Sequence, residues 1–147
     1  MSTDSRNGWN DFNENLVREF RDNGGKVTGM FAGAPLLLLT TRGAKSGEER
    51  TTPLVHTRDG DRYVIIASKG GAPTNPAWFH NLVANPRARI EVATPSGIDE
   101  LEVQSRVAEG EERDRLFASQ AALMPNFDEY QRNTTRRIPV VVLDPAR

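Results

Sequence analysis

Apolar residues recur along this chain with two different periods. Near the beginning they come three or four residues apart, which is the period of an amphipathic helix. This spacing predicts a helix over residues 9–22, and Asn23-Gly24-Gly25 predicts its end. The apolar face either packs on the domain or, because it carries Trp and Phe, covers a pocket or meets a membrane surface. It is formed by Trp9, Phe12, Leu16, Val17 and Phe20.

The remaining chain shows the alternation and the short apolar runs that are typical of β-strands. Tight turns at 59–61 and 95–97 predict hairpins, and residues 125–137 are expected to be irregular. Strands joined by such short turns favour a mainly β fold, an antiparallel β-barrel or β-roll decorated by helices, over a doubly wound sheet. The predicted strands cover residues 36–41, 51–58, 62–67, 88–93, 98–107 and 138–143, and further helices cover 76–84 and 109–124.

Composition narrows the function classes. The 147 residues suffice for one domain, and a net charge of −1 gives no attraction to nucleic acid. The absence of cysteine excludes disulfides, thiolate metal sites and cysteine nucleophiles. No His-x3-His spacing occurs, so no metal site is expected. The chain has no signal-peptide pattern and no apolar run that could span a bilayer, which predicts a cytoplasmic protein.

Two loops combine glycines with cations. The first lies within residues 40–54 and contains Lys45, and the second lies within residues 68–78 and contains Lys69, so two of the three lysines fall in the loops. Glycines allow backbone N–H groups to approach an oxyanion, and the cations supply charge. The pair predicts a phosphate-bearing ligand that is held from two sides. Neither loop is a Walker sequence or a Gly-x-Gly-x-x-Gly motif.

The usual catalytic groups are few. His56 lies in an alternating strand and is expected to be a hydrogen-bonded structural histidine or a surface one. His80 follows the second loop and has the better chance of touching a ligand. Neither Ser46 nor Ser68 stands in a Gly-x-Ser-x-Gly motif, so nothing indicates a hydrolase.

The order of the motifs resembles the deazaflavin-dependent nitroreductase family. Residues 39–54 read LTTRGAKSGEERTTPL and residues 67–86 read ASKGGAPTNPAWFHNLVANP. The match covers about residues 30–145 and continues through 109–113, Tyr130 and 137–141. The resemblance implies a split β-barrel related to FMN-binding proteins, with the deazaflavin-binding domain in residues 26–147 and the amphipathic helix in residues 1–25. It also implies hydride transfer from reduced coenzyme F420 to a quinone, a nitroaromatic or another activated acceptor.

The resemblance also implies roles for individual residues. Lys45 and Arg50 match contacts to the cofactor phosphate and acidic tail, and Lys69 is a further cation. Trp78 either forms a wall of the cofactor pocket or packs the core. The full set of implied cofactor-binding residues is Lys45, Arg50, Thr52, Pro53, Leu54, Ala67, Ser68, Lys69, Gly70, Gly71, Asn75, Pro76, Trp78 and Asn81.

Tyr130 and Ser68 are the candidate catalytic residues. Tyr130 is expected to orient the acceptor or to deliver a proton, or else to be a packing residue. The implied substrate pocket consists of Val55, Met124, Phe127 and Tyr130, and it has fewer tyrosines than that of the characterised nitroreductase. It should therefore be more apolar, which puts activity on bicyclic nitroimidazoles in doubt. Ala44 stands where relatives often carry an arginine, so the grip on the tail is expected either to be weaker here or to be supplied by Arg42.

Several alternatives stay open. An FMN-dependent oxidoreductase of the same fold, or a non-catalytic carrier of F420 or a flavin, would use the same loops. The partner is expected to be a small-molecule hydride acceptor. A homodimer, and a contact of the N-terminal helix with the inner face of the cell membrane, are further alternatives.

Overall fold

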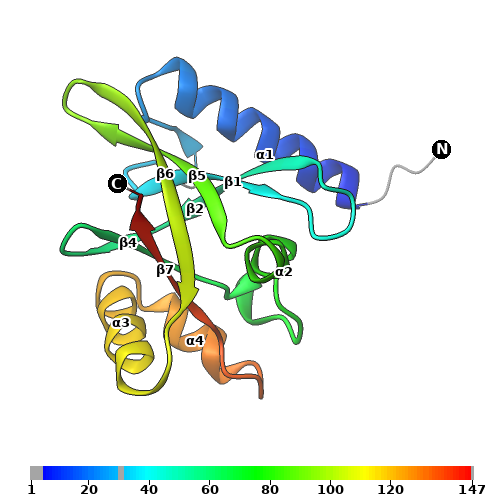
Figure 1. Ribbon diagram of the computed structural model, residues 1–147, viewed down its shortest axis with the longest axis vertical. Coiled ribbons are helices and arrows are strands. Elements are labelled where there is room, and N and C mark those ends of the chain that lie inside the picture. The colour runs from blue at the N-terminus through cyan, green and yellow to red at the C-terminus, as the bar shows by residue number, and fades with distance from the viewer. Residues whose placement is uncertain (1–4, 30–31, 147) are drawn as a thin grey trace.

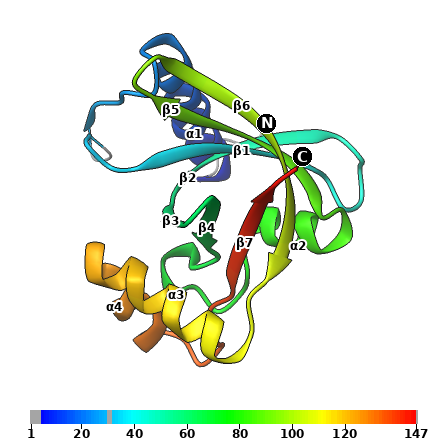
Figure 2. The ribbon, with the colours of Figure 1, turned by 60° about the vertical axis from the view of Figure 1, so that its left-hand side comes forward.

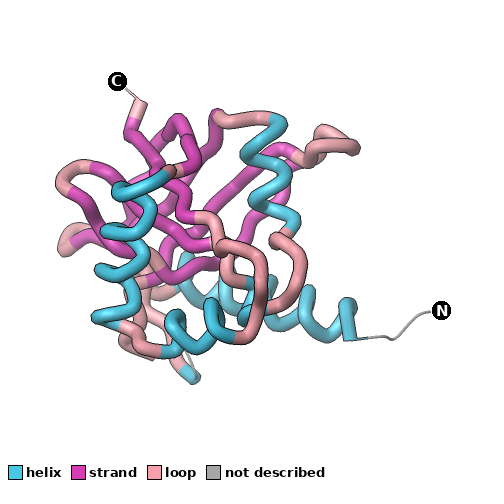
Figure 3. Tube along the Cα trace, turned by 90° about the horizontal axis from the view of Figure 1, so that it is seen from below, coloured by secondary structure: helices cyan, strands magenta, loops and turns pink. Residues whose placement is uncertain are grey.

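Seven antiparallel strands form one sheet that curls around an apolar interior, with the helices around it (Figures 1 and 3). The computed structural model describes residues 5–29 and 32–146. The strands lie in the order β2-β1-β5-β6-β7-β4-β3. Their bounds are β1 Leu36–Arg42, β2 Glu49–Val55, β3 Thr57–Asp59, β4 Arg62–Ile66, β5 Arg87–Thr94, β6 Gly97–Val107 and β7 Val140–Pro145. The helices are α1 Ser5–Asp22, α2 Ala77–Ala84, α3 Gly110–Leu123 and α4 Asn126–Arg132, with a short 3-10 helix η2 at Lys69–Gly71.

The sheet curls into a half-barrel because its two edge strands are consecutive in the chain. β2 lies at one edge and β3 at the other, yet only His56 separates Val55 from Thr57. Two Cα–Cα steps span at most about 7 Å, so the two edges must meet at this residue (Figure 2). The predicted antiparallel barrel is therefore confirmed.

Successive side chains along a strand point alternately into the barrel and outward. This gives one interior core and two outer clusters that the helices cover. Odd-numbered residues of β1, β4 and β7, such as Leu39, Ile65 and Leu143, pack together with Trp78 of α2 in the interior. Even-numbered residues of β4 and β7 pack under α3 and α4, and those of β1 pack under α1. Both faces of β1 are thus buried, which explains its continuous run of leucines.

The N-terminal helix packs on the outer face of the sheet. Leu16 and Phe20 are buried against β1, so the described part of the predicted apolar face contacts the protein itself. Arg21 adds a bidentate ion pair to Glu91 of β5, with N···O distances of 2.9 and 2.7 Å. The side chain of Trp9, which the prediction included in this face, lies outside the described part of the structure. No described helix has the length and apolar character needed to cross a bilayer.

The structure corrects four details of the predicted elements. The strand predicted over 51–58 is two strands, because the chain leaves β1 and joins β4 at His56. Within the stretch expected to be irregular, α4 forms a short helix whose Phe127 packs on the sheet. The last strand starts two residues later than predicted, since Pro139 offers no N–H and Ile138 donates its N–H to Gln131 instead. The N-terminal helix begins earlier than predicted, at Ser5.

Candidate cofactor site

The barrel is split between β2 and β4. The β3–β4 register sets Thr57 opposite Val64. If β2 continued the same register before His56, Leu54 would lie opposite Ala67 and Pro53 opposite Ser68. No such pairing between β2 and β4 forms among the described residues. Pro53 has no N–H to donate and is typical of an unpaired edge. The predicted wall residues Thr52, Pro53, Leu54, Ala67 and Ser68 thus lie along the two unpaired edges.

The first cationic loop is a tight turn between β1 and β2. The N–H of Gly43 donates to the carbonyl of Glu48 at 2.7 Å, and the N–H of Glu48 donates to Ser46 Oγ at 3.1 Å. Lys45 at the tip is exposed and has no hydrogen-bond or ion-pair partner among the described residues. Arg50 is exposed and lies 3.3 Å from the carboxylate of Glu48. Both cations can therefore reach an anion without disrupting the core.

Asn81 ties this loop to α2. Its amide oxygen accepts a hydrogen bond from the N–H of Ala44 at 3.0 Å, and its amide nitrogen donates to Thr41 Oγ1 at 3.2 Å. One turn later, Asn85 donates to the carbonyl of Arg42 at 3.4 Å. Asn81, which was predicted to contact the cofactor, therefore supports the backbone of the loop.

The second cationic loop follows β4 and has an unusual backbone. Lys69 has a φ of +48°, the only positive φ of a described residue other than glycine, and its ammonium donates to Thr74 Oγ1 at 3.1 Å. Gly71 has a φ of +85°, and a Cβ at this position would lie 2.9 Å from the carbonyl oxygen of Tyr130. Glycine is thus required here both by its φ and by the close approach of α4.

Arg136 is a residue of this site that the sequence analysis missed. Its guanidinium donates to the carbonyls of Ala67 at 3.1 Å, Ser68 at 2.7 Å and Ala72 at 2.8 Å, and to Asn75 Oδ1 at 2.8 Å. Burial lowers the pKa of Arg136. The predicted cofactor residue Asn75 is therefore held by Arg136. The one available signal was the position of Arg136 next to the motif 137–141, which the resemblance had used.

Helix α2 supports both loops. Pro76 precedes its first turn, and Trp78 is only 6% exposed within the interior core. This position supports the core-packing role that had been left open for Trp78. The second loop leads into α2, and Asn81 links α2 to the first loop, so the two loops have one rigid support.

The predicted acceptor residues fall into two groups. One group belongs to the cluster under α3 and α4 and consists of Met124, Phe127 and Tyr130. The rings of Phe127 and Tyr130 pack edge to face, with their centroids 5.4 Å apart. Tyr130 Oη accepts a hydrogen bond from Asn126 Nδ2 at 2.7 Å. Val55 packs instead with β1 and α1. Three of the four residues are thus together, and Val55 lies in a different cluster.

The two histidines have different surroundings. His56 lies at the joint of β2 and β3, with its ring centroid 5.7 Å from that of Tyr63. Its Nδ1 is buried and has no hydrogen-bond partner in the described part of the chain. Burial lowers the pKa of His56 to about 4, with a partial offset from the carbonyl of Pro35 and a further lowering by the charge of Arg58. His80 is exposed on α2. The neutral, packed state of His56 agrees with the expected structural role, but its Nδ1 lacks the side-chain hydrogen bond that was expected with it.

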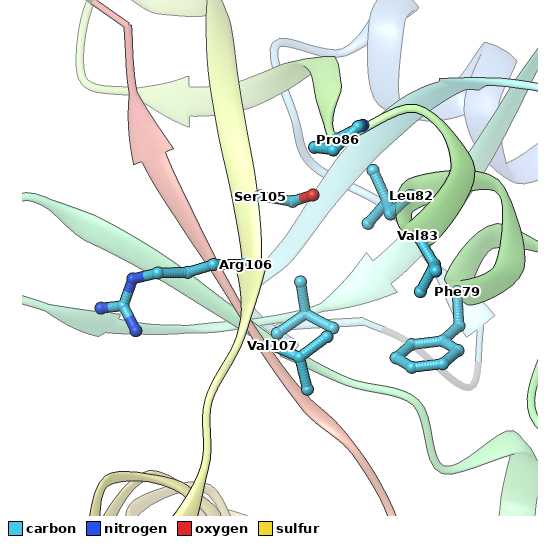
Figure 4. A pocket seen from close by; sticks show the side chains of 8 residues that line it. Phe79, Leu82, Val83, Pro86, Ser105, Arg106 and Val107 are labelled. Atoms are coloured by element: carbon cyan, nitrogen blue, oxygen red, sulfur yellow. The ribbon is translucent and has the colours of Figure 1, made fainter.

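An apolar hollow of about 230 Å³ opens beside α2. In Figure 4, Phe79, Leu82 and Val83 of α2 face Ser105 and Val107 of β6. None of the predicted cofactor or acceptor residues lines it. The predicted cations and the unpaired strand edges lie instead at the split and its loops.

The fold is an antiparallel split barrel with two cationic loops beside its open edges. A family model described as F420H(2)-dependent quinone reductase matches residues 13–145. The F420H(2)-dependent quinone reductase Rv1261c of Mycobacterium tuberculosis is 41% identical over 128 residues, which cover 84% of this chain and 83% of that protein. The chain belongs to the F420H(2)-dependent quinone reductase family, whose cofactor is coenzyme F420.

Two solved structures agree with this assignment. An F420-H2-dependent reductase, FDR-A, has a TM-score of 0.67 and 38% identity, covering 75% of this chain and 94% of that one. A structure described as a domain-swapped dimer has a TM-score of 0.69 and 33% identity, covering 95% of this chain and 99% of that one. The split-barrel fold, the F420 cofactor and the oxidoreductase function predicted from the sequence are confirmed at the level of the family.

Proposed function

We propose that this protein binds F420 in the split and reduces a quinone or a similar activated acceptor with it. The observation that carries this proposal is that α2 supports both cationic loops beside the unpaired edges of β2 and β4. Asn81 of α2 is hydrogen-bonded to the first loop, and the second loop, held by Arg136 through Asn75, leads into α2. Bound reduced F420 supplies the hydride. The protein's own task is then to hold two rings in contact and to keep water out.

The residues of the split fit the two chemically different ends of this cofactor. Lys45 and Arg50 suit the phosphate and the carboxylates of the tail, because both are exposed and Lys45 has no partner of its own among the described residues. Backbone groups near Pro53 and Ser68 suit the polar edge of the ring, since neither strand edge is paired there. Lys69 adds charge where the second loop begins.

The acceptor fits the residues of α4 that approach the second loop. The backbone of Tyr130 lies against Gly71, so this helix adjoins the proposed cofactor site. Tyr130 Oη accepts a hydrogen bond from Asn126 and therefore keeps its own proton free to donate. Met124 and Phe127 supply apolar surface beside it. This arrangement suits a quinone, which is a flat ring with oxygens that take up protons on reduction.

Fluorescence titration with F420 tests the cofactor site. We expect Lys45→Ala and Arg50→Ala each to weaken binding about tenfold, because each removes a charge-assisted contact. Lys26→Ala removes an exposed lysine outside both loops and should bind as the unchanged protein does. Equal affinity of all four proteins would contradict the site, and tighter binding of FMN than of F420 would favour the flavin-dependent alternative.

Oxidation of F420H2 by menadione tests the reaction. Tyr130→Phe should lower kcat while leaving F420 affinity unchanged if the hydroxyl orients the acceptor or donates a proton. Full turnover in this variant would remove Tyr130 from the mechanism. Tight F420 binding without any oxidation by quinones or nitroaromatics would favour a carrier.

We further propose that the protein forms a homodimer, which the relative described as a domain-swapped dimer supports. Light scattering after gel filtration measures the mass directly. A monomer of 16.3 kDa at high concentration would refute it. Flotation with anionic liposomes, with and without residues 1–25, tests the membrane contact considered for the N-terminal helix.

A further inference from the structure

The guanidinium of Arg136 makes four hydrogen bonds and no ion pair among the described residues. All its acceptors are neutral: three backbone carbonyls and one side-chain amide. No charged group contributes to its lowered pKa, which reflects burial alone. An arginine keeps its charge at neutral pH even so. A full positive charge therefore lies directly behind the second loop.

The carbonyls that point at Arg136 fix the direction of the N–H groups on the loop's other side. The described part of the chain contains no cis peptide bond, and in a trans peptide the N–H points opposite to the C=O. Because the carbonyls of Ala67 and Ser68 face Arg136, the N–H groups of Ser68 and Lys69 point away from it. Neither N–H has an acceptor among the described residues.

These N–H groups point toward the split. The N–H of Ala67 donates to the carbonyl of Pro139 at 2.9 Å, on the side of β4 that pairs with β7. The next N–H along the chain, that of Ser68, therefore points to the unpaired edge. Ser68 has right-handed helical angles (φ −76°, ψ −40°), and Lys69 has a φ of +48°. This succession turns neighbouring N–H groups toward one electron-rich atom.

We propose that Arg136 is a positioning residue, which holds this loop so that the N–H groups of Ser68 and Lys69 bind a pyrimidine carbonyl oxygen of the deazaflavin ring. The ligand in this inference rests on the proposed function. Gln131 of α4 fixes the backbone of Arg136 by donating to its carbonyl at 2.8 Å. The charge behind the loop strengthens both donors, because charge-assisted hydrogen bonds are the stronger kind.

The negative charge of the ionised ring hydroxyl of oxidised F420 is conjugated to this carbonyl oxygen. Binding at the loop should therefore lower the pKa of that hydroxyl, which the absorbance of the bound cofactor reports. Arg136→Gln removes the charge, and Arg136→Lys keeps the charge but not the planar fork. Arg137→Gln is the matched control, since the exposed Arg137 pairs with Asp114 and not with the loop.

We expect Arg136→Gln to weaken F420 binding about tenfold or more and to raise the ring pKa, with Arg136→Lys in between and Arg137→Gln unchanged. An unaltered ring pKa in Arg136→Gln would overturn the proposal, whatever happens to its melting temperature. If Arg136→Gln does not fold, Asn75→Ala removes one of the four acceptors. Asn75→Ala should shift the F420 affinity and the ring pKa in the same direction as Arg136→Gln, but by less. If neither Asn75→Ala nor Arg136→Lys shifts them, the proposal is overturned.

Parallel titrations with FMN separate this inference from the proposed cofactor. FMN carries the same pyrimidine carbonyls, so tighter binding of FMN by the unchanged protein would refute F420 as the ligand. A loss of FMN affinity in Arg136→Gln but not in Arg137→Gln would then still support the role of Arg136. Binding of neither cofactor by the unchanged protein overturns both.

Discussion

Gln120 of α3 is a buried polar residue that no predicted function uses. It is completely buried, and neither its amide nitrogen nor its amide oxygen has a hydrogen-bond partner among the residues that the structure describes. Unpaired polar groups cost free energy in an apolar surrounding, while an apolar residue of similar shape does not. At the residue scale, an apolar side chain at this position should therefore stabilise the fold.

We expect Gln120→Met to raise the free energy of unfolding by about 1–3 kcal/mol, because the desolvation cost of the amide disappears. Urea denaturation measures this change. Gln104→Met on the exposed face of β6 should stay within about 0.5 kcal/mol of the unchanged protein. If Gln120→Met lowers the free energy of unfolding instead, the amide of Gln120 has hydrogen-bond partners in solution.

Asn81 acts on the first loop through two hydrogen bonds, to Ala44 and to Thr41. Asn81→Ala should lower the free energy of unfolding by about 1–2 kcal/mol and weaken F420 binding severalfold, since the loop that carries Lys45 loses its anchor. Asn15→Ala, at an exposed position of α1, is the control for both readouts. Unchanged affinity in Asn81→Ala would mean that the loop does not need α2.

At the scale of elements, η2 and α4 form one unit. Gly71 has Tyr130 backbone atoms within 3.1 Å of where a Cβ would be, and backbone cannot move aside as a side chain can. The loop that is proposed to hold the cofactor ring and the helix that is proposed to hold the acceptor therefore contact each other directly. A displacement of one should disturb both ligands.

Gly71→Ala tests this coupling. Its positive φ and the overlap with α4 should together cost about 2–3 kcal/mol of stability, and both F420 affinity and the KM for menadione should change. Gly60→Ala also has a positive φ, of +63°, but open space around it, so it should cost about 1 kcal/mol and leave both ligands unaffected. Equal effects of the two substitutions would contradict the coupling.

At the scale of the whole molecule, closure of the barrel depends on the joint at His56. Above pH 6.5 neither the folded nor the unfolded chain protonates this histidine. Between pH 6.5 and about 4 the unfolded chain binds a proton that the folded chain excludes, so stability falls as the pH is lowered through this window. The complete loss, reached below pH 4, is about 3 kcal/mol.

Urea denaturation between pH 7 and pH 5 measures this dependence. His56→Phe should remove the slope, whereas His80→Gln, which changes an exposed histidine, should keep it. The pKa values of Asp59 and Glu112 are lowered by hydrogen bonds to Arg115 and Arg106, respectively, so these carboxylates lose their contribution only at more acidic pH. A slope that persists in His56→Phe would place its origin elsewhere.

The sequence alone determined most of the elements and the cationic loops. Hairpins, helix ends and the leucine run of β1 are encoded by residues that are neighbours in the chain, so their periods and turn signals are readable there. The order of the loop motifs also determined the family. Lys45 and Lys69 could be predicted as loop cations because they stand near glycines, whereas the cofactor contacts of Lys45 and Arg50 came from the resemblance and stay predictions.

Only the tertiary structure decided how these parts meet. The break at His56 exists because one strand pairs with β1 before it and with β4 after it, and local periodicity does not encode a change of partner. Arg136 donates a hydrogen bond to Ala67, which is 69 residues away in the sequence. Val55 packs in a different cluster from Tyr130. Such contacts depend on how the sheet curls, and no spacing in the sequence records that curl.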